Sequence, residues 1–278
     1  MTEEPASTLD GAVTSAVAYA ARAKLVAPSA LFLLATGAER FATGLDGLER
    51  VPLATVDGVP GRWKALHLLV CQVNETTVWC IEDAPEVLEG AADPAWARAF
   101  PVWWAAACGA EVLIHSSAGT SLHESATAGL AHVTDHINLS GSTPLEGLGE
   151  SRLGPLFPDQ TRVHDERLAA LALEVAEASG DRLTGAVAAC VHGPSVSTPA
   201  ELRWQRAAGA DLSVQDLAGP LVAAAHAGLP TLALCAVTDA IDGGRDLAAL
   251  VEATVTQAPS LDRLLCGIAR ELHRLDTR

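Results

Sequence analysis

The chain has 278 residues and is strongly acidic, with 18 basic residues against 34 acidic ones and a formal net charge of −16. A surface of this charge repels nucleic acid and anionic lipid, so we expect neither as a partner. The apolar stretches are short and interrupted, which excludes a membrane-spanning run of about 20 residues. Glu3 and Glu4 stand where a secretory signal would carry basic residues, so we expect a cytoplasmic protein.

The cysteines indicate a reduced, metal-free protein. Most of them lie in apolar runs and no two have the spacing of metal ligands; the six are Cys71, Cys80, Cys108, Cys190, Cys235 and Cys266. We interpret them as buried thiols that act as small apolar side chains. We therefore expect no disulfide, no metal site and no cofactor.

Hydrophobic periodicity predicts an alternation of helices and strands. Residues 9–25 carry apolar side chains at helical spacing, with Asp10 near the start and Pro28 beyond the end, and predict the first helix. Strands are predicted at residues 30–34, 65–73, 76–81, 111–115, 185–191, 211–214 and 231–237. Further helices are predicted at residues 94–108, 165–178, 199–208, 217–227, 245–256 and 261–275.

Strands that alternate with helices predict an α/β fold, in one domain of residues 1–278, with helices on both faces of a mostly parallel or mixed sheet. In such sheets a ligand lies beyond the carboxyl ends of the strands. The turns that follow the predicted strands are therefore the candidate site, at residues 36–37, 82–83, 116–119, 192–197, 215–216 and 238–239.

Two stretches of the second half carry specific motifs. The first has Asp-His-Ile-Asn-Leu at 135–139 and Gly-Pro-Leu-Phe-Pro-Asp at 154–159. The second has Gly-Pro-Ser-Val-Ser-Thr-Pro-Ala-Glu at 193–201, Gly-Ala-Asp at 209–211 and a strand that ends in Thr-Asp at 238–239. Both resemble the trimeric purine nucleoside phosphorylases, with their methylthioadenosine phosphorylase branch. A weaker likeness extends the resemblance to about residues 30–260.

The resemblance implies a phosphorylase-type sheet, mixed but mostly parallel, distorted toward a barrel and flanked by helices. It also implies a nucleoside as the small-molecule ligand, and a homotrimer or a hetero-oligomer with an active relative. At the base end, Ser197 and Asp239 replace the family's Glu and Asn, an exchange that the methylthioadenosine phosphorylase branch shares. A carboxylate accepts a hydrogen bond from a 6-amino group, which favours an adenine-type base. Asp239 as a helix N-cap is the alternative.

Four further positions match the substrate contacts of the family. Val196 replaces a stacking Phe, Gln215 replaces a Met beneath the ribose, and Asp242 offers a second carboxylate near the base. Phe157 matches the aromatic residue that reaches into the neighbouring subunit's site. Burial of Phe157 in the protein's own core is the alternative.

The phosphate end departs most from the family. Thr36 keeps a hydroxyl of the first turn, and the backbone at Ser117 and Ala118 keeps the contact of the family's Ala-Ala-Gly turn. The family's Arg and His have given way to the acidic segment 82–90, which includes Glu86, and a late hydroxyl has become Asp216. A charge pair at roughly 4 Å is worth about 4 kcal/mol at an effective dielectric constant of about 20. The resemblance therefore does not carry over to binding of inorganic phosphate, unless segment 82–90 is a solvated loop outside the site.

The remaining histidines favour structural roles over catalytic ones. His115 ends a predicted strand, His136 lies in the first motif, and His192 precedes the second motif. His192 is the one assigned to the substrate site. No metal-ligand spacing relates His123, His132 and His136.

Three functions stay open at this point. The protein acts on the N-glycosidic bond of an adenine-type purine nucleoside, with Asp239 protonating the leaving base and, where water replaces phosphate, Asp216 or Glu86 as general base. Alternatively, it is an inactive family member that serves as a binding, structural or regulatory subunit. In the third case its pocket serves a new biosynthetic reaction.

Overall fold

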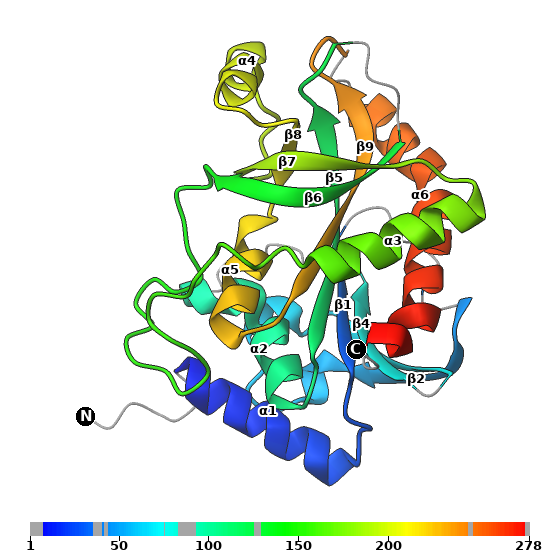
Figure 1. Cartoon of the computed structure of the whole chain (residues 1–278). Helices are drawn as coiled ribbons and strands as arrows, with labels where there is room; N and C mark the ends of the chain where they lie inside the picture. Colours follow the sequence, from blue (N-terminus) through cyan, green and yellow to red (C-terminus); the bar gives the residue numbers. More distant parts are fainter. Residues whose placement is uncertain are drawn as a thin grey trace.

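The computed structural model describes residues 8–35, 41, 44–74, 76–82, 93–124, 129–243 and 247–275. Nine strands among these residues form one sheet, in the order β2-β3-β4-β1-β5-β8-β7-β6-β9 (Figure 1). Their bounds are β1 Ala30–Leu34, β2 Asp46–Pro52, β3 His67–Val73, β4 Thr76–Glu82, β5 Val112–Ser121, β6 Gly129–Asn138, β7 Leu183–Val191, β8 Leu212–Gln215 and β9 Thr231–Ala240.

The sheet closes on itself at one end. β5 pairs with β9 as well as with β8, so β5, β8, β7, β6 and β9 form a barrel-like ring, and β1, β4, β3 and β2 extend from it as an open wing. Among the described strands, the pairs β1–β4, β1–β5, β5–β9, β6–β7 and β7–β8 are parallel, and the other pairs are antiparallel. This mixed, barrel-like sheet confirms the predicted fold class.

Helices cover both faces of the sheet, as Figure 1 shows. One face carries α1 (Leu9–Ala23), α2 (Phe100–Ala107) and α5 (Ala218–Ala227), and the other carries α3 (Glu166–Ser179) and α6 (Leu247–Glu271). A shorter helix, α4 (Pro199–Ala207), stands at the end of the ring, beyond β7 and β8.

The two faces of the central strand β1 bury different cores. Leu31 and Leu33 pack into the cluster with α1, α2 and α5, whereas Phe32 and Leu34 pack into the cluster with α3 and α6. Successive side chains of a strand point to opposite faces, so this uninterrupted apolar run is what a strand between two helical layers needs.

Most predicted elements form with ends shifted by a few residues, and four differences are informative. β2 and β6 were not predicted, because charged or polar residues interrupt their apolar pattern. The turn expected at 116–119 is instead the second half of β5. The helices predicted at 245–256 and 261–275 are largely one helix, α6, with Pro259 inside it. Burial of the C-terminal half of α6 against α3 and β9 offsets the backbone hydrogen bond that a proline removes.

The cysteines are free, as expected: four are buried, and Cys108 and Cys266 are partly buried. Burial raises the pKa of Cys190 and of Cys235 to about 12, so these thiols stay protonated. Within the described residues, no helix combines the length and the hydropathy required to cross a bilayer.

Candidate functional site

The turns after β7 and β8 hold each other in place. The side-chain amide of Gln215 donates to the backbone oxygen of Ser195, over 3.0 Å. Gly193 lies so close that a Cβ atom there would stand 2.5 Å from Oε1 of Gln215 and 3.1 Å from Oδ2 of Asp216. The backbone of one turn therefore lies directly against the side-chain ends of the other, and a larger residue at position 193 would displace them. The structure thus brings together the predicted residues of both turns.

Asp216 has an unusual backbone. Its φ of 56° lies in the left-handed region, which Asp and Asn tolerate better than other non-glycine residues. Its amide donates to the oxygen of Val191, over 3.3 Å, and its side chain is exposed. Upstream, Asp211 fixes the register of β8, because its carboxylate accepts from the amide of Val187 and from Nε2 of His123.

The segment with Val196 and Ser197 is fixed at its far end by α4. Thr198 and Glu201 form a reciprocal capping box at the start of this helix. Gln205, buried on the same helix, donates to Oγ of Ser197 over 3.4 Å. Val196 is 46% exposed, so its apolar side chain is available for contact.

Ser117 and Ala118 lie in the middle of β5, at the wall between the ring and the wing. Nδ1 of His115 lies 2.7 Å from the oxygen of Leu33, and Nε2 lies 3.4 Å from Oγ of Ser117. The carbonyl can only accept, so Nδ1 carries the proton and Nε2 accepts from the serine. Burial lowers the pKa of His115 to about 4, which keeps the ring neutral. These contacts support the predicted structural role of His115, whose ring holds the hydroxyl of Ser117.

The strand register places these residues beside the turn after β8. Gly119 of β5 is opposite Val214 of antiparallel β8. Two further steps along the two strands bring Ser117 to the level of Asp216. On the other side, Ser117 is opposite Cys235 of β9. The middle of β5 is therefore flanked by the two strands whose ends carry Asp216 and Asp239.

Asp239 lies near the end of β9, at a break in its pairing with β5. Val237 is opposite Gly119 but Asp239 is opposite Thr120, so one residue of β9 bulges out. Bulges change the direction of nearby side chains. Oδ2 of Asp239 is buried and has no hydrogen-bond partner among the described residues. Because Asp239 is inside a strand and α6 begins only at Leu247, the alternative of a helix N-cap is wrong.

Comparison with known proteins identifies the family. The sequence profile of the Phosphorylase superfamily matches residues 32–270. Purine nucleoside phosphorylase 1 of Geobacillus stearothermophilus is 33% identical over 193 residues, which is 69% of this chain and 68% of that relative. The chain belongs to the purine nucleoside phosphorylase family.

Other relatives agree with this assignment. Purine nucleoside phosphorylase 1 of Bacillus subtilis is 35% identical over 145 residues, 52% of this chain and 54% of the relative. The chain thus spans between about half and two thirds of the curated relatives it matches. A Schistosoma purine nucleoside phosphorylase solved with hypoxanthine has the same fold, with a TM-score of 0.87 over 95% of this chain and 99% of that one, at 21% identity.

One residue of this phosphorylase-family chain was missed by the sequence analysis. Arg62 lies in the short helix Gly61–Trp63, and its Nε is buried without a hydrogen-bond partner among the described residues. Burial and the nearby Arg98 lower the pKa of its guanidinium, whereas Asp93 and Asp216 raise it. A guanidinium stays charged in proteins. A cation therefore lies within electrostatic reach of Asp216, and only the rarity of basic residues could have drawn attention to it.

Other predicted site residues of this phosphorylase-family protein lie apart from these contacts. His192 is exposed directly after β7, and Asp242 is exposed in the turn after β9. Phe157 is 88% exposed, so the alternative of a core position is wrong. Thr36 and Glu86 fall outside the described residues.

A separate hollow of about 350 Å³ opens in this phosphorylase-type ring, near the starts of β6, β7 and β8. Its described lining includes Ser121, Arg182 and Asp211 and contains none of the predicted site residues. We do not assign the nucleoside site to it, because the chemistry-bearing turns lie after β7, β8 and β9.

Proposed function

We propose that this protein acts on the N-glycosidic bond of an adenine-type purine nucleoside and that Asp239 contacts the base. The observation that carries the proposal is Oδ2 of Asp239, which is buried and has no hydrogen-bond partner in the part of the chain that the structure describes. Buried polar atoms almost always have a partner, and an unpaired one costs about 1–3 kcal/mol. An exocyclic 6-amino group would supply the missing donor. A 6-oxo group would instead place two acceptors face to face.

The other contacts of the proposed site follow from its geometry. Ser197, held by Gln205, and the exposed side chain of Val196 would lie against the base. Gln215, fixed on Ser195, would donate to or accept from the ribose. His192 and Asp242 would lie at the rim. Phe157, with its ring almost fully exposed, would reach a neighbouring subunit of a homotrimer.

We further propose that the reaction does not depend on inorganic phosphate. Asp216 projects from the turn beside Ser117, and its carboxylate acts on Arg62, the cation that would otherwise attract an anion. The negative charge of Asp216 would repel a phosphate dianion bound near it. Water would then attack the ribosyl cation and lose a proton to Asp216. Asp239 in its protonated form would donate its proton to the leaving base from one oxygen while Oδ2 accepts from the 6-amino group. The acidic site would stabilise the cationic ribosyl group directly.

The effect of Asp216 on Arg62 also favours a second candidate function. A family member whose phosphate end is compensated by its own carboxylate could bind a nucleoside without cleaving it. It would then serve as a binding or regulatory subunit.

Base release from matched substrates tests the proposal. The full-length protein is incubated with adenosine, methylthioadenosine and inosine, and free base is separated and quantified. We expect adenine to be released faster than hypoxanthine. Faster release from inosine would refute the assignment of Asp239. No release, together with thermal stabilisation by adenosine but not by inosine, would favour the second candidate.

A further inference from the structure

Three ionisable side chains that are not among the proposed nucleoside contacts meet beside β6: Asp135, His136 and His164. Nδ1 of His136 lies 3.0 Å from Nε2 of His164, and the two rings meet edge to face. An oxygen of Asp135 completes the group, with all three ligand atoms within 4.8 Å of one another. The two histidines are 28 positions apart in the sequence, so residue spacing could not predict this cluster.

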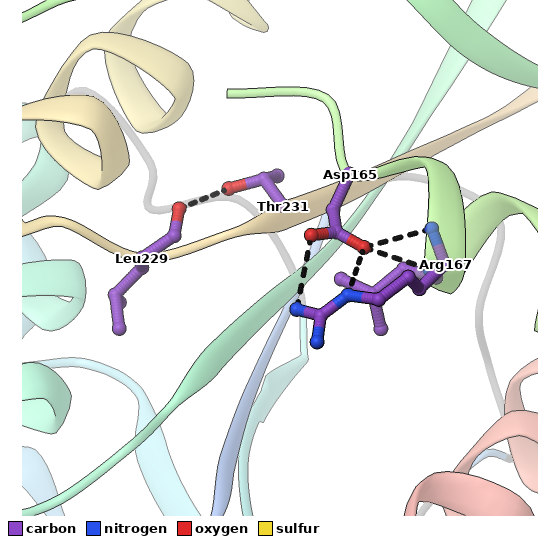
Figure 2. Close-up of polar contacts among 5 residues, drawn as sticks. Asp165, Arg167, Leu229 and Thr231 are labelled. Atoms are coloured by element: carbon purple, nitrogen blue, oxygen red, sulfur yellow. Dashed lines mark hydrogen bonds and ion pairs between the residues drawn. The ribbon is translucent and has the colours of Figure 1, made fainter. Parts of the chain in front are cut away.

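The backbone holds His164 firmly in this position. His164 itself bridges to Thr231 at the start of β9. On either side of it, the oxygen of Val163 accepts from the amide of Thr231, and the amide of Asp165 donates to the oxygen of Thr231. The side chain of Asp165 then caps α3, because it accepts from the backbone amides of Arg167 and Leu168 and pairs with the Arg167 guanidinium (Figure 2). His164 is therefore anchored between a strand and a helix.

The other two side chains come from β6, just after an irregularity in its pairing with β7. Val133 is opposite Ala186, whereas Asp135 is already opposite Val187. This shift disturbs the alternation of faces that would otherwise separate neighbouring side chains. Oδ1 of Asp135 accepts from the amide of His136 over 2.8 Å, which orients the carboxylate. The carboxylate is exposed and can rotate toward the imidazoles.

The hydrogen bonds of this cluster are incomplete. Nδ1 of His164 and Nδ1 of nearby His132 are both buried and have no partner among the described residues. Histidine binds metals through the lone pair of a neutral imidazole nitrogen, so a cluster of imidazoles with incomplete hydrogen bonds is suited to a metal ion.

We propose that Asp135, His136 and His164 bind a divalent transition-metal ion such as Zn²⁺. Two imidazoles and a carboxylate are a common ligand set for this ion, with water at the fourth position. Nitrogens bound to one tetrahedral Zn²⁺ at 2.0–2.1 Å are roughly 3.3 Å apart. Nδ1 of His136 and Nε2 of His164 lie 3.0 Å apart, so a small shift would let both bind one ion. The negative charge of the chain favours any cation. The ion would link β6 to the residues before α3. It would thus hold together the two ends of the segment that carries Phe157.

Zn²⁺ binding to the full chain tests this proposal. The protein is stripped with a chelator, and Zn²⁺ is titrated against a chromophoric competitor, with bound metal counted by mass spectrometry. We expect one Zn²⁺ per chain and a rise in melting temperature. His136→Ala and His164→Ala should each lower the affinity by at least about tenfold, and Asp135→Asn by a similar factor. His67→Ala, an exposed histidine on β3, is the matched control and should leave affinity unchanged.

Three results would overturn the proposal. The first is no Zn²⁺ binding by the unmodified chain, and the second is a Zn²⁺ affinity that the three variants do not change. The third is a Co²⁺ complex with a thiolate-to-metal charge-transfer band, since cysteines would then be the ligands. If His164→Ala does not fold, as judged by circular dichroism, His136→Gln gives the same test without a change near the helix start. The readout is independent of nucleoside cleavage.

Discussion

The two ends of the proposed nucleoside site are built on opposite electrostatic principles. At the base end, Asp239 has a buried oxygen without a partner in the described part of the chain. At the phosphate end, Asp216 is exposed and its charge acts on Arg62. A buried acceptor such as Asp239 favours a ligand that donates a hydrogen bond to it. Asp216, in contrast, already supplies Arg62 with the negative charge that a bound anion would bring. This difference is the basis of our proposal that base recognition is kept and anion binding is replaced.

The largest expected effect concerns the base end. Asp239→Asn should lower the rate of adenine release by about 10²-fold or more, because positioned acids contribute 10²–10⁴-fold. The amide should also shift preference toward 6-oxo purines. Asp57→Asn is the matched control, since Asp57 pairs with Arg22 at the surface. Equal rates for the Asp239→Asn variant and the unmodified protein would remove Asp239 from the site.

The next effect concerns β5, which lies between the two ends of the proposed site and on which His115 contacts Ser117. Its folded-state pKa of about 4 lies below the ordinary value of 6.5, so the unfolded chain takes up this proton first as the pH falls. The stability that this difference provides is complete above pH 6.5 and is lost as the pH approaches 4, by about 3 kcal/mol. Urea unfolding at several pH values measures this loss. His115→Gln should flatten the dependence, and an unchanged slope would contradict the assignment.

A smaller effect distinguishes the phosphate end. Asp216→Asn keeps a residue that tolerates the left-handed backbone and removes the charge. We expect about tenfold tighter phosphate binding, because the exposed carboxylate is partly screened by solvent. Arg62→Gln should change phosphate affinity in the opposite direction. Isothermal titration measures the phosphate affinity of both variants. If the two substitutions changed this affinity in the same direction, the proposal that Asp216 compensates the charge of Arg62 would be wrong.

The smallest expected effect concerns the loop after β7, which carries residues of the base end and lies against Asp216 at the phosphate end of the proposed site. Thr198 caps α4 and fixes the segment of Val196 and Ser197. Thr198→Ala should lower the free energy of unfolding by about 1 kcal/mol. Thr161→Ala, in an exposed turn away from α4, serves as the comparison. A loss at Thr198 no larger than at Thr161 would show that the cap does not hold the loop.

Local pattern predicted the elements whose neighbours are close in sequence. The apolar runs of β1, β4 and β9 are visible in the sequence because each depends on adjacent residues. β6 was missed, since His132, Asp135 and His136 interrupt its apolar pattern, and closure of the ring depends on its distant pairing with β9. The motifs gave the candidate turns and their order. They could not show that Arg62 lies within electrostatic reach of Asp216, or that His164 lies beside His136, because only the fold brings those pairs together.

The most direct test of whether the reaction needs inorganic phosphate is to measure adenine release from methylthioadenosine as phosphate is added. Protein freed of phosphate by dialysis is assayed at saturating nucleoside while phosphate is raised from zero. We expect the protein to release adenine and free methylthioribose at a rate that phosphate does not change. A rate that starts near zero and saturates with phosphate, with methylthioribose 1-phosphate as the product, would contradict it.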